Sequence, residues 1–497
     1  MAEAAIGQAR ELADARAQLR SLSLVWSALL MLLLPILGLL GLFMRAYQTQ
    51  ALIETIDSAW FYSSMTLHGL GFVGLSYTVS FVAMLYALSR HLVFNPRLIW
   101  ISTGLTVIGV ALLVTCFLMR FAPGWYFLYP LPFRSAGGWS ALATDLFLAA
   151  LAVLGVAWLL WELELLRAIA SRYSLSQALG WHYLKGINTP ELPPIVLVAT
   201  VCAIAGIAAL VAAVAMLIMM LIHRFTGSLV DPLVVKNLTF FFGHVLINLA
   251  MYHGIGFLYA VFPEYSGHAW KAAKPMIIAW NCVLFLVLFA YFHHLYMDFA
   301  QPRWVHVVGQ IASYGTAIPA AVVTILGMLA QVYHRPVRWT LASSLLFFGT
   351  MGWAVGGVAA VLDSTIAFNF RFHNTLWVPA HFHTYLLVGI VFIMLGFAAH
   401  LTQELSGRSE SPVLARSIVA LLLTGGYGFV FMFYLSGAHG VPRRYAFYPP
   451  ELEVGTTLAK VALIFVSLVV LGVLLYLIEV GRRWFAARAA LQASASS

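Results

Sequence analysis

Charged residues are scarce in this chain. Asp, Glu, Lys and Arg make up 9% of its 497 residues, whereas 62% are hydrophobic, and a soluble domain has about a quarter charged residues. This balance excludes an ordinary soluble protein and predicts an integral membrane protein. The net charge of +9 does not indicate nucleic-acid binding, because the basic residues are scattered at the ends of apolar runs and form no long tract.

Cysteine is also rare. Cys116, Cys202 and Cys282 all lie within apolar segments, which excludes a disulfide framework and a cysteine-rich metal site. The sequence has no Cys-x-x-Cys-His motif for haem c and no Cys/His/Met cluster suited to a binuclear copper site. A redox role would therefore require electrons from another protein.

Long apolar runs, in contrast, are abundant. A helix needs about 20 apolar residues to cross a bilayer, and twelve runs are long enough. They lie near residues 22–44, 65–89, 98–119, 139–166, 193–222, 237–262, 275–297, 304–330, 339–362, 377–402, 415–437 and 457–481. We expect an all-α integral membrane protein of about twelve transmembrane helices, with an N-terminal segment at 1–21 and one domain at 22–497.

The basic residues predict the orientation of these helices. Connections on the side of the N-terminus contain 17 Lys and Arg residues, and the opposite connections contain 10. The positive-inside rule then places both termini in the cytoplasm. This predicts a multi-pass protein of a bacterial or archaeal cytoplasmic membrane, with residues 1–21 on the cytoplasmic side.

Six of the sixteen histidines fall at one depth of the predicted bundle, in its outer part. Histidine is costly inside a membrane and usually has a function there. A single one could be hydrogen-bonded between helices, but four separate segments at one level favour metal ligation. The six are His68 in the second helix, His244 in the sixth, His293 and His294 in the seventh, and His381 and His383 in the tenth.

The spacing of these histidines suggests their chemistry. Residues two apart on a helix diverge by about 200°, so His381 and His383 can serve two centres on opposite flanks. Adjacent His293 and His294 can share one ion if His244 closes the site. Three imidazoles suit copper, with iron or zinc as alternatives. A haem with two histidine ligands transfers electrons, whereas a haem with one can bind a small gas.

At these residues the chain resembles the catalytic subunit I of the haem-copper oxidase superfamily, along essentially its whole length. The matching motifs are Thr66-Leu-His-Gly69, Gly243-His244, His293-His294 and Val378-Pro-Ala-His-Phe-His383. The resemblance implies two haems and one copper, or iron in its place. It implies His68 and His383 on a low-spin b-type haem, His381 on a high-spin a- or b-type haem, and His244, His293 and His294 on the copper.

Two outer segments extend the resemblance. His439-Gly-Val-Pro-Arg-Arg-Tyr445 resembles the family loop whose paired arginines hold haem propionates, and guanidinium groups suit carboxylates. Arg443 and Arg444 are the candidates, with ordinary loop charges as the alternative. His373 lies in a segment that resembles the polar region above the high-spin haem. The sequences of residues 373–381 and 293–302 resemble the B-type branch more than the mitochondrial-like branch.

One departure from the family bears on the substrate. Most oxygen reducers of the family have an active-site tyrosine four residues after the first copper ligand, where this chain has Asn248. In the C-type branch the tyrosine precedes the histidine pair by six residues, where this chain has Val287. Asparagine supplies neither a proton nor an electron, so Asn248 favours reduction of nitric oxide to nitrous oxide.

Two other functions remain as alternatives. The first is oxygen reduction by a B-type cytochrome c oxidase that uses another tyrosine, such as Tyr252, Tyr291 or Tyr296. The second and more remote is a non-redox transporter, although the chain shows no halves with matching interrupted helices.

The resemblance also implies partners and proton routes. Electrons would come from a copper-containing subunit II or a haem c subunit, supplied by cytochrome c, a cupredoxin or quinol. Val323 replaces the family's lysine on the eighth helix, so protons are expected from the outer side near Asp298, Glu451 or Glu453, without pumping. Tyr259 and Thr324 are more typical of packing residues than of a proton path.

Overall fold

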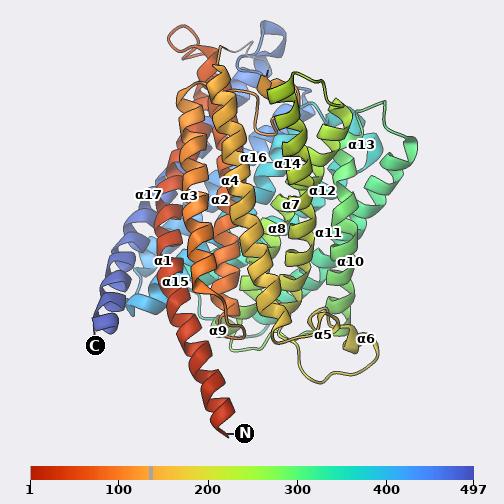
Figure 1. The fold of residues 1–497 in the computed structure, drawn as a ribbon. Helices are drawn as coiled ribbons and strands as arrows, with labels where there is room; N and C mark the ends of the chain where they lie inside the picture. Colours follow the sequence, from red (N-terminus) through yellow and green to blue (C-terminus); the bar gives the residue numbers. More distant parts are fainter. Residues whose placement is uncertain (1, 134–137, 497) are drawn as a thin grey trace.

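The computed structural model describes residues 2–133 and 138–496, so residues 1, 134–137 and 497 of the predicted ranges lie outside this part. It is a bundle of long helices whose two termini lie at the same end, called here the terminus side (Figure 1). Twelve membrane spans occur within the described residues, as predicted. Their helices are α1 (Ala2–Tyr47), α2 (Ser58–Leu88), α3 (Pro96–Leu118), α4 (Ala141–Ala170), α7 (Pro194–Thr226), α8 (Pro232–Val261), α10 (Lys274–Ala290), α11 (Arg303–Val332), α12 (Leu341–Asp363), α14 with α15 (Trp377–His383, Val391–Ser406), α16 (Pro412–Ala438) and α17 (Glu453–Ser496).

Short helices occupy several connections. α5 (Leu175–Ala178), α6 (Trp181–Leu184) and α9 (Pro263–Ser266) lie on the terminus side, whereas α13 (Ile366–Phe372) lies toward the opposite end (Figure 1). Helix α1 runs without a break from Ala2 through the apolar stretch, and its membrane-spanning part begins at Arg16. The segment predicted at 1–21 is therefore helical from residue 2 onward and continuous with the first span.

Polar caps explain where several spans begin. The Asp57 carboxylate accepts a hydrogen bond from the Ala59 backbone N–H at 2.9 Å, and Asp231 accepts one from Leu233 at 2.7 Å. Such caps satisfy amide groups that have no partner inside the helix. Helix α7 ends at Gly227, whose positive φ of 71° suits glycine.

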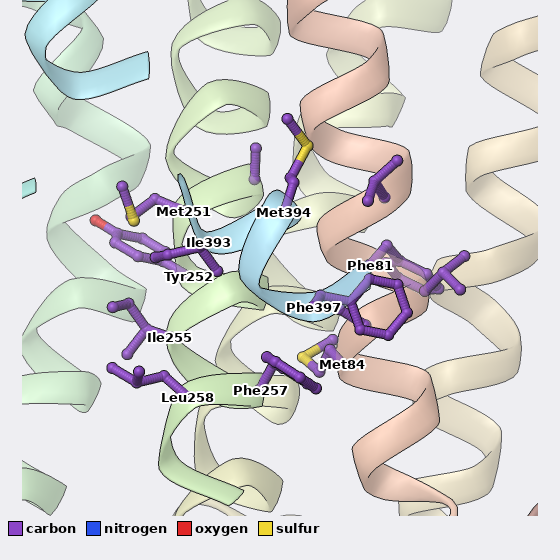
Figure 2. Packing of buried hydrophobic residues seen from close by; sticks show 14 of the residues in the cluster. Phe81, Met84, Met251, Tyr252, Ile255, Phe257, Leu258, Ile393, Met394 and Phe397 are labelled. Carbon is purple, nitrogen blue, oxygen red and sulfur yellow. The ribbon is translucent and has the colours of Figure 1, made fainter. Parts of the chain in front are cut away.

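The core of the bundle is formed by three spans. About four fifths or more of the most apolar window of α2, α8 and the α14–α15 span is buried, at 83%, 83% and 94%. Phe81 of α2, Phe257 of α8 and Phe397 of α15 pack together there (Figure 2). Glycine allows close approach of these helices, since a Cβ at Gly254 would lie 2.9 Å from Ile393. These central helices carry four of the six candidate ligands.

Candidate functional site

All six candidate histidines line one cavity of about 1070 Å³ among the central helices. Its walls are mostly aliphatic and aromatic, and the imidazoles project from α2, α8, α14 and the short 3₁₀ segment Tyr291–Leu295 that continues α10. Sites for large cofactors are typically apolar cavities with a few polar groups that fix orientation. This cavity has that character.

Three of the histidines form a cluster that fits a metal ion. His244, His293 and His294 each offer one ring nitrogen, and the three nitrogens lie within 4.8 Å of one another. Among the described residues, these three histidines form the group that could hold a metal ion. Nδ1 of His293 lies 2.9 Å from the Ser313 hydroxyl, and Nδ1 of His244 is buried without a hydrogen-bond partner. The triad predicted from the sequence is therefore assembled, with Ser313 orienting one ring.

A second pair lies on the other flank of α14. The rings of His68 and His383 have centroids 6.1 Å apart and planes 24° apart. Nδ1 of His68 lies 2.8 Å from the Leu37 carbonyl, and Nδ1 of His383 lies 2.7 Å from the Pro379 carbonyl. Both contacts assign Nδ1 as the donor and leave Nε2 free to bind a metal, as in the usual arrangement of metal-binding histidines.

The two histidines of α14 thus face different partners. His381 lies near His244 and His293, close enough to interact electrostatically, whereas His383 faces His68. Directly after His383 the chain forms a π-helical segment, Thr384–Ile390. Such wider turns often occur at functional sites. The divergence of about 200° expected for residues two apart on a helix explains the separation.

Asn248 lies beside the metal cluster. Its Nδ2 donates to the His244 backbone carbonyl at 2.8 Å and lies 3.4 Å from Nε2 of the same histidine. Two tyrosine hydroxyls approach its Oδ1, that of Tyr252 at 3.5 Å and that of Tyr385 at 3.4 Å. Only Tyr385 of these two also lines the cavity. Tyr385 was missed from the sequence, although it follows His381 by four residues and therefore shares its helix face.

The other tyrosines considered from the sequence point elsewhere. The Tyr296 hydroxyl donates to the Ser364 carbonyl at 3.1 Å, and the Tyr291 hydroxyl lies 3.5 Å from Asn237. Tyr259 and Thr324 share a 2.7 Å hydrogen bond. This bond joins α8 to α11, as hydrogen bonds between polar side chains commonly do in membrane bundles.

Polar groups gather at the cavity wall near α13. Nη2 of Arg443 lies 3.4 Å from Nδ1 of His373, while its Nε is buried without a partner. Burial and then the Arg443 charge lower the pKa of His373 to about 4. Burial lowers the pKa of Arg443 to about 10, and Asp363 opposes this shift. At neutral pH the arginine is charged and the histidine neutral.

Arg444, the second arginine predicted from the sequence, also lines the cavity. The Arg444 guanidinium lies over the Tyr126 ring at 4.4 Å. Lys236 also lines the cavity and pairs with Asp298 at 2.6 Å. Lys236 was not identified from the sequence, where a lysine near a helix start resembles an ordinary interfacial charge. The donor set fits carboxylate-bearing haems, because a cation with an unpartnered nitrogen stands beside the imidazoles.

Comparisons with known proteins agree with this geometry. Residues 21–474 match the family described as Cytochrome C and Quinol oxidase polypeptide I. Subunit 1 of cytochrome c oxidase from Bacillus subtilis is 24% identical over 250 residues, which are 50% of this chain and 40% of the relative. The subunit from Thermus thermophilus is 23% identical over 408 residues, which are 77% of this chain and 69% of the relative. The chain thus spans about two fifths of the length of the first of these relatives.

A solved structure shows the same fold. The cryo-EM structure of a heme-copper terminal oxidase dimer has a TM-score of 0.76 against this chain, with 19% sequence identity. The match covers 94% of this chain and 84% of the other. The family match, which spans residues 21–474, shows that the chain belongs to the Cytochrome C and Quinol oxidase polypeptide I family.

Proposed function

We propose that this chain is the catalytic subunit of a respiratory haem-copper reductase that passes electrons from a low-spin haem to a gas-binding centre. The observation that carries this proposal is the division of six cavity histidines into two sets, the pair His68 and His383 and the group of His381 with the metal triad. Because His381 and His383 belong to one helix turn, the two sets are held at a fixed, short separation.

The chain's own residues define what each set does. His68 and His383 would together hold one haem, and a haem with two histidine ligands serves electron transfer, whereas His381 would hold the other, and a haem with a single histidine ligand can bind a gas. Copper on His244, His293 and His294 would supply the second binding point for a gas. Ser313 and the Leu37 and Pro379 carbonyls keep the imidazoles oriented.

We propose nitric oxide as the substrate. Coupling two nitric oxide molecules to nitrous oxide and water takes two electrons and two protons, and both electrons can come from the metals. The residue beside His244 is Asn248, which has no ionisable proton at neutral pH and is not a redox group. Reduction of oxygen takes four electrons, and breaking its O–O bond benefits from a nearby phenol that Asn248 does not provide.

Oxygen is the second candidate, and Tyr385 is the observation that favours it. Its hydroxyl reaches the cavity wall 3.4 Å from Asn248, so it could supply the phenol missing from position 248. The relatives named above are described as cytochrome c oxidases. In that case Tyr385 would take the role of the tyrosine that most oxygen reducers of the family have at the position of Asn248.

Turnover of both gases by the purified complex tests these alternatives. With a reduced electron donor, we expect nitric oxide to be consumed faster than oxygen and Tyr385→Phe to leave nitric oxide reduction within a few-fold of the unchanged protein. Fast oxygen consumption that Tyr385→Phe abolishes would instead establish oxygen as the substrate. The reduced-minus-oxidised optical spectrum tests the redox role itself, since a transporter would show no haem bands.

Electron supply and orientation complete the proposal. We propose a partner subunit with copper or haem c, supplied by cytochrome c, a cupredoxin or quinol, because the three cysteines lie apart in the chain. The location in a bacterial or archaeal cytoplasmic membrane, with both termini in the cytoplasm, rests on the distribution of Lys and Arg. Protons for the gas chemistry are proposed to enter near Asp298, whose partner Lys236 lines the cavity.

Gly41 of α1 provides a test of the His68 position. A Cβ at residue 41 would lie 2.7 Å from Cε1 of His68, whereas one at Gly38 would meet nothing within 4 Å. Gly41→Ala is therefore expected to displace the imidazole, weaken the low-spin haem absorption and cost about 1–3 kcal/mol of stability through overpacking. Gly38→Ala is the matched control. Equal low-spin spectra and thermal midpoints in the two variants would contradict the assigned position of His68.

A further inference from the structure

Three ionisable side chains meet between α2, α4 and α8, outside the set of histidine ligands. The Tyr77 hydroxyl donates a 2.6 Å hydrogen bond to Oε1 of Glu162. Nε2 of His253 lies 3.9 Å from the same oxygen. All three side chains are 0% exposed. We call Tyr77, Glu162 and His253 the inner cluster.

The inner cluster has no compensating fixed charge. Within the described part of the chain, no Lys or Arg forms an ion pair with Glu162, and its Oε2 and both ring nitrogens of His253 have no hydrogen-bond partner. A bare carboxylate oxygen inside a membrane is costly, so the Glu162 carboxyl holds its proton and His253 is neutral. Glu164, two residues further on, differs because it pairs with Arg167 at 2.7 Å.

The surrounding helices make room for this carboxyl. A Cβ at Gly206 of α7 would collide with Oε1 of Glu162, so the absence of a side chain there creates the space. Cys202 of α7 is the further titratable side chain that interacts electrostatically with Tyr77 and Glu162. The cluster is thus a polar site enclosed by α2, α4, α7 and α8.

The inner cluster lies next to the histidine cavity, toward the terminus side. Trp158 of α4 packs on Tyr77 with ring centroids 4.9 Å apart and also lines the cavity, as does Thr78. Tyr77 follows His68 by nine residues, and His253 follows His244 by nine, a rise of about 14 Å along each helix. At that distance and an effective dielectric constant of about 20, one electron changes proton affinity on the order of tenfold.

We propose that the inner cluster is a redox-linked proton-binding site. It holds one proton on the Glu162 carboxyl, and its affinity for a second proton, on the His253 imidazole, rises when one electron from the donor protein enters the cavity. The proton is taken from water and forms an N–H bond on His253, and none of the cluster's groups is oxidised or reduced. The added imidazolium offsets the added negative charge. This site would act whichever gas is reduced, so it goes beyond the proposed function.

Infrared difference spectroscopy of the purified complex, reduced minus oxidised, tests the carboxyl. We expect a paired signal from the C=O stretch of a protonated carboxyl, because the group stays protonated but gains an imidazolium neighbour. Glu162→Gln should remove the signal, and the matched variant Glu164→Gln should retain it. Tyr77→Phe should move it to higher frequency, because the carbonyl loses its hydrogen-bond donor. An unchanged carboxyl region in Glu162→Gln, with both haem spectra intact, would overturn the proposal.

Proton uptake on reduction tests the imidazole. Measured with a pH-sensitive dye in weakly buffered solution at several pH values, the maximum uptake should fall by up to about half a proton per chain in His253→Gln, the most that a tenfold change in affinity yields. It should remain unchanged in Glu164→Gln. If Glu162→Gln does not assemble with haem, Tyr77→Phe and His253→Gln decide the matter. If the carboxyl band did not shift in Tyr77→Phe and proton uptake did not change in His253→Gln, the cluster would be purely structural.

Discussion

Replacing His293 by alanine is expected to remove the non-haem metal and leave both haems in place. His293 is one of only three imidazoles in the cluster, so two ligands would remain for an ion that prefers three or four. Losing an outer hydrogen-bond partner of a metal-bound histidine costs roughly 10- to 100-fold in affinity, and loss of the ligand itself should cost more. Metal analysis of the purified chain, with an optical spectrum of the same sample, measures both.

Ser313→Ala gives this prediction a graded control. The Ser313 hydroxyl lies 2.9 Å from Nδ1 of His293 and donates to the Gly309 carbonyl at 2.6 Å. Removing it should lower metal affinity within roughly the 10- to 100-fold range and preserve some gas turnover. If His293→Ala retained its full metal content while Ser313→Ala behaved normally, the triad would not be the metal site.

Much of the fold could be predicted from hydropathy because membrane helices must satisfy their backbone hydrogen bonds internally and span a fixed thickness. The twelve expected spans are all present. Local breaks were less predictable: the 3₁₀ continuation at Tyr291 and the π-helical segment after His383 depend on packing against neighbouring helices. The hydrophobic pattern of the sequence, with its period of 3.6 residues, does not distinguish these two segments from a regular α-helix.

The candidate ligands could be found because histidine is rare within apolar helices. The groups around them could not be found in the same way, because their roles depend on distant contacts. Ser313 is an ordinary serine in sequence, and its place beside His293 follows from the packing of α10 against α11. Tyr385 could have been recognised from its spacing to His381 alone. Whether it contacts Asn248 depends on the relative position of α8 and the π-helical segment.

Replacing His383 by alanine is expected to abolish the low-spin haem signal while sparing the open haem and the metal. His383 faces His68 across a 6.1 Å centroid separation, and a haem with one remaining ligand is no longer closed. Haem content should fall toward half, or the remaining haem should show a high-spin spectrum. Gas reduction should fall to a small fraction of the normal rate, since electrons lose their path to the triad.

The matched variant for this prediction is His381→Ala, on the opposite flank of the same turn. It should preserve the low-spin spectrum and remove gas binding to the open haem, so the two alanine variants should have complementary spectra. The π-helical segment that follows is common to both variants, and general damage to α14 would disturb both haems in each of them. Identical spectra in the two variants would therefore contradict the division of His381 and His383 between two centres, and complementary spectra would be incompatible with a single shared metal.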